Sequence, residues 1–304
     1  PRQYGFDQTY GYLHGQIDQY THRYKNGDRS WHRNDAFIDQ TGHATDLIAD
    51  EALRFLEVQR QAPFFLWVAF SVPHFPLQEE EKWVAPYAKS IKDPSRRLYA
   101  ASVAHLDAAI GRIIAGLEKT GLLSETVVLF LSDNGGQELY RSETDYEGKH
   151  GPYPTLGNNL PLRGWKQDLY EGGIRAPAFV YWPGKLKPTR LQVPVSYLDW
   201  FPTLAHLANL EITASWKLEG RNVWPLLSTE KRTLPSSTLY WNVENATAVL
   251  KDDWKLVVHQ QRPAEVELYH LSTDATEAAN LATQNPAKVT ELQRVLAAQK
   301  SLDP

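Results

Sequence analysis

The hydrophobic pattern of the chain alternates between helical spacing and short continuous apolar runs. Apolar residues three and four apart predict a helix from 45 to 59, capped by Thr45, and a long helix from about 95 to 120. Continuous apolar runs predict strands covered on both faces at 63–71 and 127–133. A strand, helix, strand series at this spacing predicts a parallel sheet, with the loops at its carboxyl ends on one edge.

The pattern changes after about residue 233. Before that point, a further strand is predicted at 176–182. After it, short β-like runs recur at regular spacing, at 238–243, 246–253, 254–260 and 265–271, followed by a helix at 286–300. We therefore expect an α/β fold with a mainly parallel sheet sandwiched by helices in residues 1–233. Residues 234–304 are expected to form a small antiparallel subdomain with one packing helix.

Composition narrows the classes of function. The chain has 304 residues, of which 42% are hydrophobic and 22% charged, as in globular proteins with a large core. Its net charge of -4 gives no basic footprint, so we expect no nucleic-acid partner. No run approaches the roughly 20 apolar residues of a membrane span, so none is expected. The chain has no cysteine, which excludes disulfides, thiolate chemistry and cysteine metal sites.

Asp133 and Asn134 follow the apolar run at 127–133 and precede two glycines. Carboxylate and amide oxygens are ligands that calcium and magnesium prefer, and glycine allows the backbone to bend so that adjacent side chains reach one ion. An ordinary Asx-Gly turn gives the same letters. The pair is therefore a candidate metal site at the mouth of the sheet, with a plain turn as the alternative.

Two further side chains lie on loops expected at the same edge. His74 sits between two prolines in "SVPHFPLQ", where an imidazole can protonate a leaving oxygen or bind an anion. Lys166 lies in "PLRGWKQDLYEGGIRAP", where an ammonium can reach a tetrahedral oxyanion. Each also has a plain alternative: a histidine packed in a loop, and a solvated lysine. Together they suit a pocket that handles an anion beside a metal ion.

Three segments, in this order and spacing, resemble the formylglycine-dependent sulfatases of the arylsulfatase type, within the alkaline phosphatase-like superfamily. They are "PFFLWVAFSVPHFPLQ", "VVLFLSDNGG" and "PLRGWKQDLYEGGIRAPAFVYWPG". The start "YGFDQTYGYL" and the late segments "LKDDWKLV" and "ELYHLSTDATEAANL" resemble the family as well. The resemblance covers nearly the whole chain.

The resemblance implies roles for individual residues. Asp133 and Asn134 match the Asp-Asn pair that helps to bind calcium, Lys166 the lysine that contacts the sulfate, and His74 the histidine that contacts the sulfate or the leaving oxygen. In the family, a hydrated formylglycine attacks sulfur while the metal neutralises sulfate oxygens. Lys149 and His150 follow the metal pair on a polar loop. They are candidates to contact the group that bears the sulfate, with a mobile polar loop as the alternative.

The chain departs from the family pattern at the nucleophile. The family motif is Cys or Ser, x, Pro, x, Arg, and it is absent from these 304 residues; "SVPHF" has Phe75 where arginine belongs. Two aspartates of the family's first strand, and a lysine and histidine after the nucleophile, are missing too. We expect these groups in a missing N-terminal segment of the same enzyme. The chain alone should then be inactive, and its calcium affinity weak.

The sequence is compatible with three functions. The first is hydrolysis of sulfate esters of an aryl compound or carbohydrate. The second is a phosphodiesterase or phosphonate hydrolase of the same superfamily, although two-metal phosphatases need further His and Asp ligands. The third is a non-catalytic protein that binds sulfated glycans. Family habit suggests a periplasmic, secreted or lysosomal location.

Overall fold

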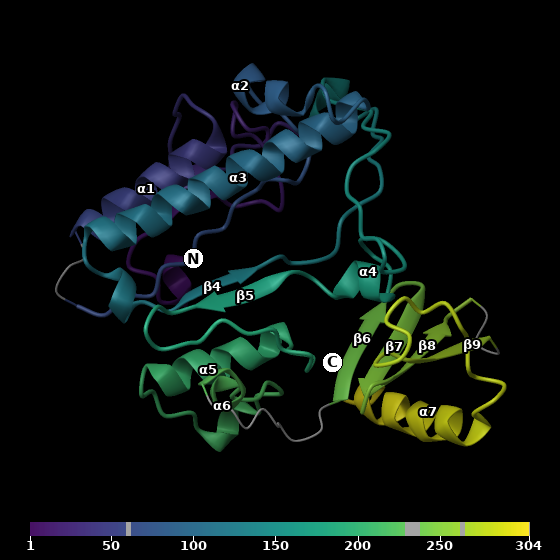
Figure 1. The fold of residues 1–304 in the computed structure, drawn as a ribbon. Coiled ribbons are helices and arrows are strands. Elements are labelled where there is room, and N and C mark those ends of the chain that lie inside the picture. Colours follow the sequence, from purple (N-terminus) through teal and green to yellow (C-terminus); the bar gives the residue numbers. More distant parts are fainter. Residues whose placement is uncertain (59–61, 229–237, 262–264, 304) are drawn as a thin grey trace. The chain divides into compact units, whose positions relative to one another are not determined.

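A computed structural model describes residues 1–58, 62–228, 238–261 and 265–303 (Figure 1). The chain forms two compact units. Unit 1 comprises Pro1–Val127 and Gly136–Asn158, and unit 2 comprises Val128–Gly135 and Asn159–Pro304. The predicted boundary between residues 233 and 234 lies outside the described residues.

Unit 1 combines a small antiparallel sheet with three α-helices. Its strands are β1 (Tyr10–Tyr12), β2 (Trp31–Arg33) and β3 (Ala36–Phe37), and its helices are α1 (Ala44–Val58), α2 (Glu81–Val84) and α3 (Pro94–Lys119). Short 3-10 turns occur at Arg2–Tyr4, Ala85–Tyr87, Leu123–Glu125 and Asp145–Gly148. Helices α1 and α3 pack side by side (Figure 1). Ile48 of α1 and Trp31 of β2 belong to one buried cluster, which joins this helix to the sheet.

The two long helices lie close to their predicted positions. Helix α3 begins after Asp93, whose carboxylate accepts a 2.7 Å hydrogen bond from the N–H of Arg96, and ends before Gly121, which has a φ of 76°. The predicted cap of α1 is wrong. The helix begins at Ala44, and the Nδ1 atom of His43 accepts the N–H of Thr45 at 3.3 Å. The predicted last residue, 59, lies outside the described residues.

Helix α3 has the length and apolar composition of a membrane span, which the sequence pattern did not lead us to expect. Core helices of soluble proteins share these properties, and a single such helix is weak evidence for a membrane. Two of its polar side chains make hydrogen bonds within unit 1. His105 bonds to Glu79, and Arg112 bonds to Asp46 of α1.

The predicted strand at 63–71 forms no ladder with the described residues. Phe65 and Trp67 are 64% and 70% exposed, whereas Val68 and Phe70 pack against the buried cluster of unit 1. The expectation of a strand covered on both faces is therefore wrong for the described chain. An apolar run favours an extended segment, but it does not by itself supply a neighbouring strand.

Unit 2 contains a two-stranded sheet made of β4 (Val128–Leu131) and β5 (Ala178–Tyr181). The strands are antiparallel, with Leu131 opposite Ala178. The α/β class is confirmed, but the expected parallel pairing is wrong for the described strands, all of whose pairs are antiparallel. A run of apolar residues is equally compatible with parallel and antiparallel pairing. The relative direction of two strands therefore depends on the partner strand, which lies far away in the sequence.

The remaining elements of unit 2 include three short helices and the C-terminal sheet. The helices are α4 (Glu171–Ile174), α5 (Trp200–Leu207) and α6 (Trp224–Ser228), with 3-10 turns at Tyr197–Asp199 and Ala214–Trp216. The sheet has the order β6 (Thr238–Val243), β7 (Ala246–Lys251), β8 (Trp254–His259) and β9 (Val266–His270), all antiparallel. Helix α7 (Pro286–Lys300) packs its Leu292 against Leu256 and Leu268 of this sheet (Figure 1). The predicted antiparallel subdomain with one helix is confirmed.

Candidate functional site

Asp133 and Asn134 form the turn that leaves β4. The N–H of Asn134 donates to Oδ1 of Asp133 at 3.0 Å, and the Asn134 side-chain amide donates to the carbonyl of Gly135 at 2.9 Å. Asp133 is exposed and Asn134 is half-buried. Two oxygen-bearing side chains therefore stand next to each other on a bent backbone, which is a suitable donor set for a hard cation.

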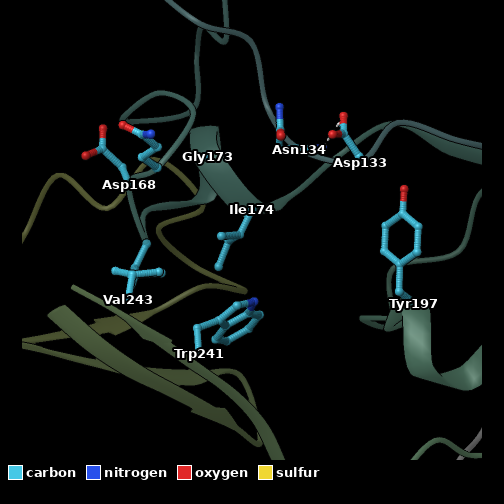
Figure 2. A pocket seen from close by; sticks show the side chains of 10 residues that line it. Asp133, Asn134, Asp168, Gly173, Ile174, Tyr197, Trp241 and Val243 are labelled. Carbon is cyan, nitrogen blue, oxygen red and sulfur yellow. Dashed lines mark hydrogen bonds between the residues drawn. The ribbon is translucent and has the colours of Figure 1, made fainter. Parts of the chain in front are cut away.

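This turn opens onto a pocket of about 250 Å³ within unit 2 (Figure 2). The pocket is lined by Asp133, Asn134, Gln167, Asp168, Leu169, Gly173, Ile174, Tyr197, Trp241 and Val243. Lys166 is half-buried in the loop that contributes Gln167 and Asp168. Two loops that the sequence singled out separately thus meet at one pocket, although Lys166 itself is not among the residues that line it.

Glycines hold these two loops together by close backbone packing. The N–H of Gly135 donates to the carbonyl oxygen of Gly173 at 2.9 Å, and the N–H of Gly172 donates to the carbonyl oxygen of Arg163 at 2.6 Å. A Cβ atom on Gly135 would lie 1.7 Å from the carbonyl oxygen of Gly172. Only glycine permits this approach, so the "DNGG" and "YEGG" segments place the metal turn against the lysine loop.

The pocket also contains residues that the sequence reading missed. The hydroxyl of Tyr197 donates to the backbone carbonyl of Ser132, directly before the metal turn. Burial raises the pKa of Tyr197, and the negative charge of Asp133 adds to the effect. Trp241 of β6 forms another wall. Trp241 belongs to the predicted β-like run at 238–243, but nothing in the spacing of either residue pointed to this pocket.

His74 lies in unit 1, on the loop that follows the 63–71 run. Its ring Nδ1 donates to the carbonyl of Phe75 at 2.8 Å, and its backbone N–H donates to Ser71 at 2.9 Å. The bond to Phe75 places a proton on Nδ1 and fixes the ring orientation. The role of His74 at the sulfate stays a prediction, because the metal turn and Lys166 belong to unit 2.

Lys149 and His150 also lie in unit 1. Lys149 is exposed and pairs with Glu147 at 2.6 Å, an interaction that raises the pKa of Lys149. His150 Nε2 lies 2.8 Å from Oδ2 of the buried Asp18. Burial opposes ionisation of Asp18, but the N–H groups of two following residues and the imidazole of His150 together lower its pKa. Lys149 is thus an exposed charged side chain, and the position of the His150 side chain is fixed by Asp18. Contact of either residue with substrate stays a prediction.

A second group of metal-type side chains lies in unit 1. His43, Glu79 and His105 each offer a ligand atom, and these atoms lie within 4.8 Å of one another. However, both ring nitrogens of His43 contact the backbone, at Thr45 N–H and the Gln78 carbonyl. His105 donates from Nδ1 to Glu79 at 2.7 Å. Calcium takes oxygen ligands, so this nitrogen-rich group suits it poorly, whereas the Asp133–Asn134 turn fits.

Comparison with known proteins identifies two family models along the chain. The sulfatase model matches residues 1–210, and the model for the C-terminal region of N-sulphoglucosamine sulphohydrolase matches residues 164–301. The second match covers the lysine loop and the antiparallel sheet. Together the two models cover nearly the whole chain.

Individual relatives agree with these models. The chain is 28% identical to arylsulfatase J of Mus musculus, over 97% of the chain and 56% of the relative. It is 27% identical to an N-acetylgalactosamine-6-O-sulfatase of Bacteroides thetaiotaomicron, over 84% of the chain and 51% of the relative. The chain thus spans about half the length of these relatives.

Among solved structures, Ps i-CgsB in complex with k-i-k-neocarrahexaose is 27% identical and superimposes with a TM-score of 0.83. The match covers 98% of this chain and 67% of that one. A phosphonate monoester hydrolase of Agrobacterium radiobacter, at 18% identity and a TM-score of 0.59, is similar in fold alone.

Proposed function

Because the chain belongs to the sulfatase family, we propose that it is the part of a sulfuric ester hydrolase that carries half of the metal site and the sulfate-binding lysine. The observation that carries the proposal is the shared pocket of the Asp133–Asn134 turn and the Lys166 loop. A tetrahedral dianion or monoanion needs positive charge on several oxygens at once. A cation at the turn and an ammonium on the adjacent loop supply it.

Asp133 and Asn134 would hold calcium through side-chain oxygens, and the bound ion would neutralise charge on the sulfate oxygens. Lys166 would place its ammonium on another sulfate oxygen. His74 would give a proton to the alcohol oxygen as its bond to sulfur breaks. The Nδ1–H bond to the Phe75 carbonyl stabilises the protonated ring that this step needs.

The nucleophile would come from a segment outside these 304 residues, since they contain no formylglycine motif. The 63–71 run supports such a partner. It is apolar, forms no strand pair among the described residues and exposes Phe65 and Trp67. An unpaired apolar segment of this kind favours addition of another strand.

We further propose that the substrate is a sulfated carbohydrate or aryl ester. The pocket presents the rings of Tyr197 and Trp241 next to polar Asn134 and Gln167, a mixture that suits a sugar or aryl ring bearing hydroxyl groups. The named relatives include an N-acetylgalactosamine-6-O-sulfatase.

The test is sulfate release by the polypeptide encoded by the whole reading frame, with an aryl sulfate and a sulfated oligosaccharide as substrates. We expect inorganic sulfate to be released, and kcat to fall at least about 100-fold in Asp133→Asn and Lys166→Ala. Faster hydrolysis of a phosphonate or phosphate diester would support the related hydrolase class instead. Binding of a sulfated glycan without sulfate release would support a non-catalytic role, and turnover by the 304-residue chain alone would contradict the placement of the nucleophile.

A further inference from the structure

A lysine is fully buried in unit 2 between two glutamates. Nζ of Lys255, on β8, lies 3.0 Å from Oε1 of Glu171 and 2.7 Å from Oε1 of Glu277. The side chains of Lys255 and Glu277 are 0% exposed and that of Glu171 is 8% exposed. Arg175, 3.8 Å from Glu171, brings a second positive charge to the group. The three buried side chains are called the Lys255 triad below.

The Lys255 triad joins the C-terminal sheet to the first residue of α4. Besides its contact with Lys255, the Glu277 carboxylate accepts the backbone N–H of Glu171 at 2.6 Å. Glu171 is therefore held at both its side chain and its main chain. A second tie lies nearby, where Arg163 donates to the hydroxyl of Tyr269 on β9 at 2.7 Å.

The residues after Glu171 abut the metal turn. Gly172 and Gly173 pack against Gly135, which follows Asn134 directly. A Cβ atom on Gly173 would lie 2.2 Å from the carbonyl of Asp168, so the same two glycines also press on the loop of Lys166. These backbone segments are packed so closely that an added Cβ atom would not fit between them. A shift of Glu171 must therefore move Gly135 or open the contact.

We propose that the Lys255 triad is a positioning device, through which the C-terminal sheet sets the Asp133–Asn134 turn and the Lys166 loop relative to each other. The proposal deepens the proposed function and rests on it. Lys255, Glu171 and Glu277 are positioning residues, because they act through Gly172, Gly173 and Gly135.

The chemistry of the triad favours this role over simple stabilisation. Burying a lysine and two carboxylates costs desolvation energy that their attraction often fails to repay, and apolar side chains of similar volume are frequently as stable. Hydrogen-bonded charged groups differ from apolar groups in having a defined geometry, since each carboxylate oxygen must face its donor. Directional bonds fix the position of α4, which apolar packing would leave adjustable.

The experiment compares Lys255→Met with Leu292→Ala. The first keeps the length of the side chain and removes the charge; the second lowers the stability of the same subdomain, because Leu292 is buried in its apolar core. For each variant of the 304-residue chain we measure the melting temperature, the calcium Kd by calorimetry, and hydrogen exchange at residues 132–136. Glu277→Gln, which keeps an acceptor for the N–H of Glu171, serves as the conservative variant.

We expect Lys255→Met to raise the calcium Kd and the exchange rate at Gly135 by at least about tenfold each, the range seen when outer partners of metal ligands are removed. Leu292→Ala should lower the melting temperature comparably but change both readouts less than about twofold, and Glu277→Gln should fall between. Equal effects of Lys255→Met and Leu292→Ala would overturn the proposal. If calcium binding by the wild-type chain were too weak for calorimetry, as the expected absence of two ligands allows, exchange at Gly135 would decide the positioning role: an unchanged rate in Lys255→Met would overturn it.

Discussion

Gly135 donates its backbone N–H to the carbonyl oxygen of Gly173 at 2.9 Å. This single bond joins the turn that bears Asp133 and Asn134 to the segment that follows the lysine loop. The contact depends on the absence of a side chain, because a Cβ atom on Gly135 would lie 1.7 Å from the carbonyl oxygen of Gly172. Adding one methyl group at Gly135 therefore tests this close backbone contact directly.

Gly135→Ala should lower the free energy of unfolding by several kcal/mol, roughly the cost of overpacking a rigid backbone contact. Urea unfolding measures the change. Gly111→Ala is the matched control: Gly111 lies in α3 with no neighbouring atom within 4 Å of an added Cβ, so alanine should stabilise the protein by up to about 1 kcal/mol. Equal destabilisation by both changes would show that the close approach at Gly135 is not restrictive.

Protonation of Glu51 should account for part of the stability that unit 1 loses in acid. Burial raises the pKa of its carboxyl, but bidentate hydrogen bonds from Arg33 at 2.6 and 2.8 Å, together with Arg54, outweigh this and lower the pKa from 4.5 to about 2. A folded-state pKa below the unfolded value stabilises the protein above pH 4.5, and this contribution is lost as the pH falls from 4.5 towards 2.

Glu51→Gln should therefore cost about 1–2 kcal/mol at pH 7, after allowance for solvent screening of the exposed arginines, and should flatten the stability curve between pH 4.5 and 2. Chemical denaturation across this range measures both effects. Parallel curves for the variant and the wild type would contradict the prediction.

The pKa of His105 should lie above its usual value mainly because of Glu79, with Asp46 adding to the effect. Burial disfavours its charge, but the hydrogen bond to Glu79 prevails and raises the pKa of His105. Since the raised pKa belongs to a base, the stabilisation is complete below pH 6.5 and is lost as the pH rises through the folded-state value. Glu79→Gln should lower this pKa in NMR titrations. An unchanged midpoint would assign the shift to Asp46 instead, 3.3 Å from Nε2.

Tyr197 should report on calcium. Its pKa is raised by burial and by the negative charge of Asp133. A cation bound at Asp133 would oppose that charge, so calcium should lower the pKa of Tyr197, and Asp133→Asn should lower it without calcium. NMR of ring-labelled tyrosine measures the shift. If neither calcium nor Asp133→Asn changed the pKa of Tyr197, the cation would have to bind elsewhere.

The C-terminal subdomain could be predicted from the sequence because its signals are local. The short apolar runs of β7 and β8 are joined at Asp252 and Asp253, which both have a positive φ, as a tight hairpin turn requires. No such local signal pairs β4 with β5, whose contacts bridge a long insertion. The sequence pattern instead predicted a parallel partner for the 127–133 run in the 63–71 run, and this prediction is wrong for the described strands.

Some residues at and around the candidate site could be predicted from local sequence and others could not. Asp133 and Lys166 could be proposed because their residue types and flanking glycines suggest chemistry. Lys255 could not, since its letters sit within the apolar run "WKLVV" and its partner Glu171 lies 84 residues earlier. Only the fold shows that this lysine is buried between carboxylates.

The most direct test of the account is a crystal structure of the chain with calcium and sulfate bound. The account predicts a calcium ion about 2.3–2.6 Å from side-chain oxygens of both Asp133 and Asn134. It also predicts a sulfate within hydrogen-bonding distance, about 3 Å, of the Lys166 ammonium and the His74 ring. Calcium away from this turn, or a sulfate that Lys166 and His74 do not both reach, would contradict it.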